Sequence, residues 1–146
     1  MTLPFDLAGK RIWVAGHRGM VGSAVVRRLA RENVGEILVA PRDQVDLTRQ
    51  AQVEDWVAAA RPDVVVLAAA RVGGIAANAA RPVDFLHDNL MIEANIMAAS
   101  AAAKVGKLLF LGSSCIYPKF ADQPIVEEAL LTGALEPTNQ WYAVAK

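Results

Sequence analysis

The stretch VAGHRGMVGSAVVRRL, residues 14–29, joins an apolar run to a helical pattern through a glycine-rich turn. Gly16, Gly19 and Gly22 have the spacing G-x-x-G-x-x-G. Glycines at such a turn permit a tight bend, close approach of a pyrophosphate and close packing of helix on strand. The N-terminus of the helix also offers unpaired backbone N–H groups to phosphate. The stretch therefore predicts the first strand, loop and helix of a dinucleotide-binding fold; an ordinary glycine-rich turn is the alternative.

The rest of the chain repeats this alternation of apolar runs and helical patterns. Buried strands are predicted at residues 11–15, 36–40, 63–70 and 107–113, and helices at 21–32, 49–60 and 82–104. This order is typical of an α/β fold with a doubly wound parallel sheet covered on both faces. Residues 139–146 predict the opening of a further helix. We therefore expect residues 1–146 to form an incomplete Rossmann domain, with any substrate domain outside this chain.

Composition excludes several classes of protein. Of the 146 residues, 54% are hydrophobic, and 15 basic residues balance 15 acidic ones. This excludes a disordered chain and gives no basic surface for nucleic acid. No apolar run approaches the roughly 18 residues of a membrane span, and the N-terminus lacks a signal-peptide pattern. A single cysteine forms no internal disulfide and no thiolate zinc site. We expect a cytoplasmic protein without metal, membrane or nucleic-acid partners.

The end of the second predicted strand indicates which dinucleotide binds. An NAD site usually has an acidic residue there, which holds the ribose 2′-hydroxyl. This chain has Ala40, Pro41 and Arg42 instead. Arg42 and Arg18 suit a 2′-phosphate, which favours NADP(H), although both could be solvated surface charges. Asp46 either accepts a hydrogen bond from the adenine amino group or caps the loop before Thr48.

Candidate catalytic residues lie in the second half of the chain. Tyr142 and Lys146 are spaced i, i+4 and would share one face of a helix. An ammonium group beside a phenol lowers the pKa of the phenol, which makes it a usable proton donor. Ser113 and Cys115 follow the fourth strand, and in an extended segment both would face the same side. Ser113, Tyr142 and Lys146 are expected to polarise a carbonyl for hydride transfer, while Cys115 is either reactive or a small core residue.

Five segments together carry a family resemblance: AGHRGMVGSA, AAARVGGI, DNLMIEANI, KLLFLGSSCIYPK and LEPTNQWYAVAK, which span Ala15 to Lys146. They resemble the extended short-chain dehydrogenases/reductases and, among these, the GDP-L-fucose synthase family. The resemblance implies 3,5-epimerisation of GDP-4-dehydro-6-deoxy-D-mannose, followed by reduction of its 4-keto group with NADPH. It also implies a homodimer.

The resemblance implies a role for each catalytic residue. Tyr142 would protonate the C4 oxygen, Lys146 would tune the tyrosine and contact the ribose, and Ser113 would bind the keto oxygen. Cys115 would exchange the protons at C3 and C5, with a histidine partner beyond Lys146, because neither His17 nor His87 fits that role. The expected cofactor contacts are Gly16, His17, Arg18, Gly19, Met20, Val21, Gly22, Arg42, Asp43, Gln44, Val45, Asp46, Leu47, Leu111, Gly112, Ser113, Ser114 and Lys146.

Other interpretations remain open at this point. UDP-sugar 4-epimerases and dTDP-sugar 4,6-dehydratases keep a bound NAD and have acid/base residues other than Cys115 near the serine. A protein that binds NADP without turnover is a second alternative, and the fragment alone is expected to be inactive. Gly73 and Gly74 either approach a ligand or belong to a flexible loop. Asn89 and Asn95 have either a side-chain role or exposed positions on the long helix.

Overall fold

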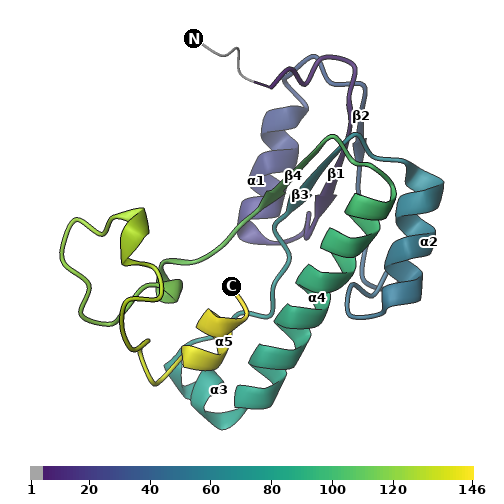
Figure 1. Ribbon diagram of the computed structural model, residues 1–146. Helices are drawn as coiled ribbons and strands as arrows, with labels where there is room; N and C mark the ends of the chain where they lie inside the picture. The colour runs from purple at the N-terminus through teal and green to yellow at the C-terminus, as the bar shows by residue number, and fades with distance from the viewer. Residues whose placement is uncertain (1–4) are drawn as a thin grey trace. The chain divides into compact units, whose positions relative to one another are not determined.

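The computed structural model describes residues 5–146, which form two compact units (Figure 1). The first unit contains residues 5–69 and 92–111, and the second contains residues 70–91 and 112–146. None of the helices within these described residues is both long and apolar enough to cross a membrane.

The first unit is built on a four-stranded parallel sheet with the order β2-β1-β3-β4. Its strands are β1 (Arg11–Ala15), β2 (Glu36–Leu38), β3 (Val64–Leu67) and β4 (Lys107–Phe110). In the register, Trp13 of β1 lies beside Leu38 of β2 and Val65 of β3. The predicted α/β class and parallel sheet are confirmed, although β2, β3 and β4 are shorter than the apolar runs suggested.

Helices cover both faces of this sheet (Figure 1). Helix α1 (Met20–Leu29) packs on Ile12 and Val14 of β1 through Leu29. Helix α2 (Gln50–Ala60) and the part of α4 (Pro82–Ala102) from residue 92 onward pack on the other face, where Trp13 lies fully buried. Successive residues of β1 thus point to opposite faces, and both faces are apolar because both are covered.

Strand β4 departs from the expected burial. It lies at the edge of the sheet, and Leu109 is 49% exposed. The facing residue of β3, Val66, is buried in the cluster that packs against α1. Coverage by α1 therefore extends over β1 and β3 but does not reach β4.

The strand order places a switch point beside β1. From β1 the chain passes to β2 on one side and then to β3 on the other side. In doubly wound sheets, ligands bind outside the carboxyl ends of the strands where the order reverses. Residues 16–19, after β1, and residues 68–69, after β3, lie at this edge of the first unit.

The second unit is assembled from short elements. It contains α3 (Ile75–Ala80), the beginning of α4, two 3-10 turns, η1 (Ser114–Ile116) and η2 (Glu127–Ala129), and α5 (Gln140–Val144). Helix α3 was not predicted, because IAANAA is too short to show a helical pattern. The extended segment expected at Ser113–Cys115 is wrong: the backbone bends into η1, and Ile116 N–H donates to the Ser113 carbonyl oxygen.

Candidate active site

The phosphate loop requires glycine at two positions. Gly16 has a φ of 93°, and a Cβ there would lie 2.6 Å from the backbone nitrogen of Ala69. A Cβ at Gly22 would lie 2.7 Å from the carbonyl carbon of Gly16 and 3.0 Å from Cα of His17. The loop closes through a 3.0 Å hydrogen bond from Gly19 N–H to the Gly16 carbonyl oxygen. At both glycines, backbone atoms therefore pack directly against the backbone of another segment, and this contact shapes the edge of the sheet after β1.

The start of α1 is open to a ligand. Gly19 is its N-cap, in an extended conformation, and Met20 and Val21 are exposed at 88% and 44%. The first N–H groups of a helix have no partner within it, and they lie at the positive end of the helix dipole. Arg18 is exposed next to this turn, and His17 is half-buried. This combination fits a diphosphate group.

Asp46 adopts the capping role that the sequence left as one of two alternatives. Its Oδ1 accepts hydrogen bonds from the Thr48 hydroxyl at 2.8 Å and from Thr48 N–H at 3.0 Å. Burial raises the pKa of Asp46, but these hydrogen bonds outweigh it, so the pKa lies below its usual value. Its Oδ2 lies 3.7 Å from Nη2 of Arg42, whose side chain is 81% exposed. Arg42 therefore remains accessible to an anion.

The neighbouring residues divide into exposed and buried positions. Asp43 and Gln44 are exposed, whereas Val45 is buried in the core against α2 and α4, and Leu47 packs on that core. The buried Asn95 side chain also holds the backbone at Leu47, because it donates a 2.9 Å hydrogen bond to the Leu47 carbonyl oxygen. Two of the expected cofactor contacts in this loop, Val45 and Leu47, thus have side chains that pack in or against the core.

Ser113 and Cys115 are linked through the first turn of η1. Ser113 is its N-cap, and Ser113 Oγ accepts a 3.2 Å hydrogen bond from Cys115 N–H. This bond uses a lone pair of the hydroxyl oxygen, so the hydroxyl proton can still be donated to a ligand. Cys115 is a half-buried free thiol, and its Sγ accepts a 3.2 Å hydrogen bond from Asn139 Nδ2. Sequence patterns missed Asn139, because 24 residues separate it from Cys115.

Tyr142 and Lys146 lie at the C-terminal end of the second unit. Tyr142 is half-buried within α5, whose last residue is Val144. Lys146 follows the end of the helix, and its N–H donates to the Ala143 carbonyl oxygen at 3.0 Å. Leu111 is half-buried after β4, and Gly112 and Ser114 are exposed.

Asn89 and Arg71 hold the segment that follows β3 in place. Asn89 is 1% exposed; its Oδ1 accepts from Arg71 N–H at 2.8 Å, and its Nδ2 donates to the Arg71 carbonyl oxygen at 3.0 Å. The Arg71 guanidinium binds Asp88 at 2.6 Å and Asp84 at 3.0 Å. Gly73 lies against Phe85, whose ring a Cβ at this position would approach to 2.8 Å. Of the two alternatives for Asn89 and Asn95, exposed positions are excluded, because both side chains are buried. The hydrogen bonds of Asn89 hold this loop against α4.

The Arg71–Asp88 pair predicts a dependence of stability on pH. The hydrogen bond from Arg71 holds the pKa of Asp88 below its usual 3.8. The resulting stabilisation is present above the pKa of the unfolded state and is lost as pH falls through the folded pKa. Asp88→Asn should lower Tm by about 2–4 °C at pH 6, and the difference should vanish near pH 2. Thermal unfolding across this range checks it, with the exposed Asp55→Asn as control; a difference that is independent of pH would contradict it.

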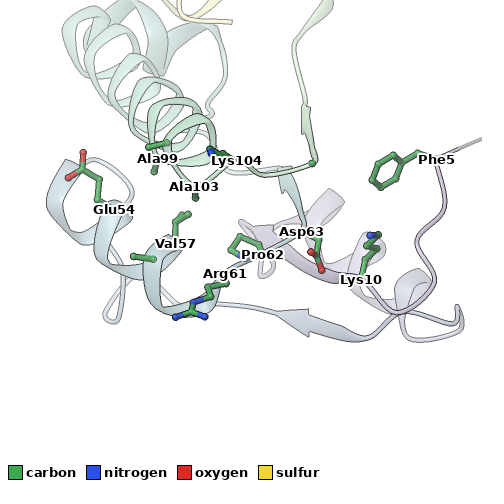
Figure 2. Close-up of a pocket in the computed structure, with 13 residues that line it drawn as sticks. Phe5, Lys10, Glu54, Val57, Arg61, Pro62, Asp63, Ala99, Ala103 and Lys104 are labelled. Atoms are coloured by element: carbon green, nitrogen blue, oxygen red, sulfur yellow. The ribbon is translucent and has the colours of Figure 1, made fainter.

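A separate cavity of about 840 Å³ lies at the opposite edge of the sheet in the first unit (Figure 2). Lys10 comes from before β1 and Asp63 from before β3, and Arg61 and Lys104 follow the C-terminal ends of α2 and α4. Helix C-termini disfavour anions, and the lining mixes acidic and basic side chains. None of the expected cofactor or catalytic residues lines this cavity.

The model of the NAD-dependent epimerase/dehydratase family matches residues 12–146. The chain belongs to this family. Within this family, the chain is 61% identical over 140 residues to a GDP-L-fucose synthase of Sinorhizobium fredii. The aligned region covers 96% of this chain and 44% of that protein. The chain is 52% identical over 140 residues to the GDP-L-fucose synthase of Escherichia coli K12, and this aligned region covers 96% of this chain and 44% of that protein.

Solved structures agree with this family assignment. A GDP-L-fucose synthetase from Naegleria fowleri bound to NADP has a TM-score of 0.87 and 30% identity, over 98% of this chain and 46% of that chain. The resemblance predicted from sequence is confirmed. The chain spans less than half the length of these members of the family.

Proposed function

We propose that the complete protein is an NADPH-dependent enzyme that converts GDP-4-dehydro-6-deoxy-D-mannose to GDP-L-fucose, by 3,5-epimerisation followed by 4-keto reduction. The observation that carries this proposal is the 61% identity to a GDP-L-fucose synthase over 140 residues, 96% of this chain. The family match over residues 12–146 includes the phosphate loop, Ser113, Cys115, Tyr142 and Lys146. UDP-sugar 4-epimerases and dTDP-sugar 4,6-dehydratases are less well supported, because they are not expected to have a cysteine at position 115.

NADP(H) is the proposed cofactor, and it supplies the hydride. The open start of α1 would hold its pyrophosphate, and the exposed Arg18 and Arg42 would hold the 2′-phosphate. Guanidinium groups match phosphate geometry through paired hydrogen bonds. The NADP-bound relative from Naegleria fowleri supports this choice.

In the proposed epimerisation, Cys115 exchanges protons at the carbons next to the keto group. The ketone acidifies these C–H bonds, because the negative charge that remains after proton loss moves to the C4 oxygen. Ser113 would stabilise that oxygen with its hydroxyl proton, since its lone pair already accepts from Cys115 N–H. The proton returns on the opposite face of the sugar ring through an acid partner outside this chain.

In the proposed reduction, Tyr142 supplies the proton. Hydride reaches C4, and the phenol O–H donates its proton to the C4 oxygen, which yields the alcohol. The Lys146 ammonium would stabilise the phenolate that remains and contact the ribose. Ser113 would bind the same oxygen in both stages, so one site would serve two reactions.

The test is a cofactor and substrate assay on the complete protein. NADPH should be oxidised in the presence of GDP-4-dehydro-6-deoxy-D-mannose, at a kcat/KM at least about tenfold above that with NADH, as expected for the loss of one charge-assisted phosphate contact. The corresponding UDP- and dTDP-4-keto sugars serve as comparison substrates. No oxidation with the GDP-sugar would reject the proposal.

A substrate domain for the GDP moiety, a homodimer and a cytoplasmic location all stay predictions. So does the inactivity of the 146-residue chain alone, which the same assay on that fragment would test.

A further inference from the structure

Asn139 does not behave as an asparagine at a helix start usually does. It is the N-cap of α5, where an asparagine oxygen normally accepts a hydrogen bond from an N–H of the first turn. Its side chain makes no such bond. Instead, Nδ2 donates to Cys115 Sγ at 3.2 Å, and Oδ1 is buried without a hydrogen-bond partner among the described residues. Capping of α5 therefore does not explain the position of the Asn139 side chain.

The backbone of Asn139 is held on both sides. Its N–H donates to the Glu136 carbonyl oxygen at 3.2 Å, and its carbonyl oxygen accepts from Ala143 N–H at 3.0 Å. Glu136 is itself anchored by Lys119 at 2.8 Å, and that hydrogen bond holds the pKa of Glu136 below its usual value. Thr138 contributes two further hydrogen bonds to the Glu136 carboxylate. An anchored turn thus presents the Asn139 amide to the sulfur.

Cys115 is held from the other direction as well. Ser113 Oγ binds its backbone N–H, and Asn139 binds its sulfur. A cysteine side chain otherwise has three staggered rotamers to choose from. The hydrogen bond from Asn139 Nδ2 to the sulfur favours one of these rotamers, and the bond from the Cys115 N–H to Ser113 Oγ holds the backbone from which the side chain extends.

We propose that Asn139 is a positioning residue for the epimerisation, and that it acts by holding the Cys115 sulfur. This inference rests on the proposed function of Cys115. The amide N–H fixes the direction in which the sulfur faces the substrate carbon. Ser113 and Tyr142, which act on the C4 oxygen, do not need this contact.

The test is Asn139→Asp in the complete protein, which keeps the size of the side chain and removes the donor. Exchange of solvent deuterium into C3 and C5 of GDP-4-dehydro-6-deoxy-D-mannose, measured by mass spectrometry without NADPH, should slow by about 10- to 100-fold, as for a misplaced reacting group. Thr132→Ala removes a hydrogen bond of the same unit, from the Thr132 hydroxyl to the Ala129 carbonyl oxygen, and none from the sulfur or from the turn that holds Asn139, so it should exchange at the wild-type rate. Wild-type exchange in Asn139→Asp would overturn the inference.

A double-mutant cycle distinguishes positioning of the sulfur by Asn139 from a loss of activity that does not depend on the sulfur. Cys115→Ala alone should also slow the exchange, and adding Asn139→Asp to it should change the rate by less than about twofold, because alanine offers no acceptor and the shared contact is already lost. A structural role for Asn139 predicts the same loss in both backgrounds. That result would reject the inference even if both single variants are impaired.

A measurement without substrate keeps this inference apart from the proposed function. If the wild-type protein exchanges no deuterium, the proposed function fails. Alkylation of the Cys115-containing peptide by iodoacetamide at fixed pH then still reports on the sulfur. Asn139→Asp should slow it by about three- to tenfold, because a carboxylate in place of the N–H donor repels the thiolate that reacts, whereas Thr132→Ala should not slow it. Equal rates in all three proteins would reject the contact.

Discussion

Tyr142→Phe should lower the rate of hydride transfer by about 10²- to 10⁴-fold, the range for loss of a general acid. The substitution removes one oxygen from a half-buried ring in α5, so packing should be retained. Binding of NADPH should stay close to wild type, because the proposed cofactor contacts lie mainly in the phosphate loop and at Arg42. Single-turnover NADPH oxidation with GDP-4-dehydro-6-deoxy-D-mannose measures the effect.

The chain offers a matched control for this variant. Tyr117 is half-buried too and follows η1 as its C-cap. Tyr117→Phe removes the same atom from the same unit and should leave the hydride rate near wild type. If Tyr142→Phe transfers hydride as fast as Tyr117→Phe does, Tyr142 is not the proton donor. Deuterium exchange at C3 and C5 should persist in Tyr142→Phe, since that step is assigned to Cys115.

Gly22→Ala should disrupt both cofactor binding and stability. The new methyl group would meet the backbone of Gly16 and His17, which are not free to move like the tip of a side chain. Either α1 or the phosphate loop must shift, at a cost of about 3 kcal/mol in the free energy of unfolding. The Kd for NADPH should rise at least about tenfold, because the shift misplaces the N–H groups at the start of α1.

Urea unfolding and fluorescence titration with NADPH measure these two effects. The control is Gly74→Ala at the N-cap of α3, where φ is −71° and no atom lies within 4 Å of the new Cβ. This substitution should change neither quantity beyond experimental scatter. Normal NADPH affinity in Gly22→Ala would show that this loop does not bind the pyrophosphate.

Much of the fold could be predicted because its signals are local. A strand buried on both faces is apolar throughout, as in VVVL of β3, and a long helix shows its period within its own sequence. Boundaries were less accurate, since the apolar run continues past Phe110 while the strand does not. Helix α3 and η1 were missed, because segments of three to six residues have no detectable period.

The candidate site was predictable as a set of residue types and only partly as an arrangement. Motifs predict the glycines of the phosphate loop, Ser113, Cys115, Tyr142 and Lys146 as site residues. Asp46 had two interpretations, and only its hydrogen bonds to Thr48 showed the capping role. The sequence allowed either an exposed Asn89 or a side-chain role for it, and the three hydrogen bonds of Asn89 decide for the side-chain role.

The sequence by itself determined the α/β class, the strand-loop-helix motif around Gly16 to Gly22 and the family resemblance, because each depends on neighbouring residues. Only the tertiary structure decided that Cys115 is bound by Ser113 on one side and by Asn139 on the other. The physical reason is that a hydrogen bond across 24 residues depends on how two turns without periodic patterns fold against each other. The direction of the lone thiol is therefore a property of the folded unit.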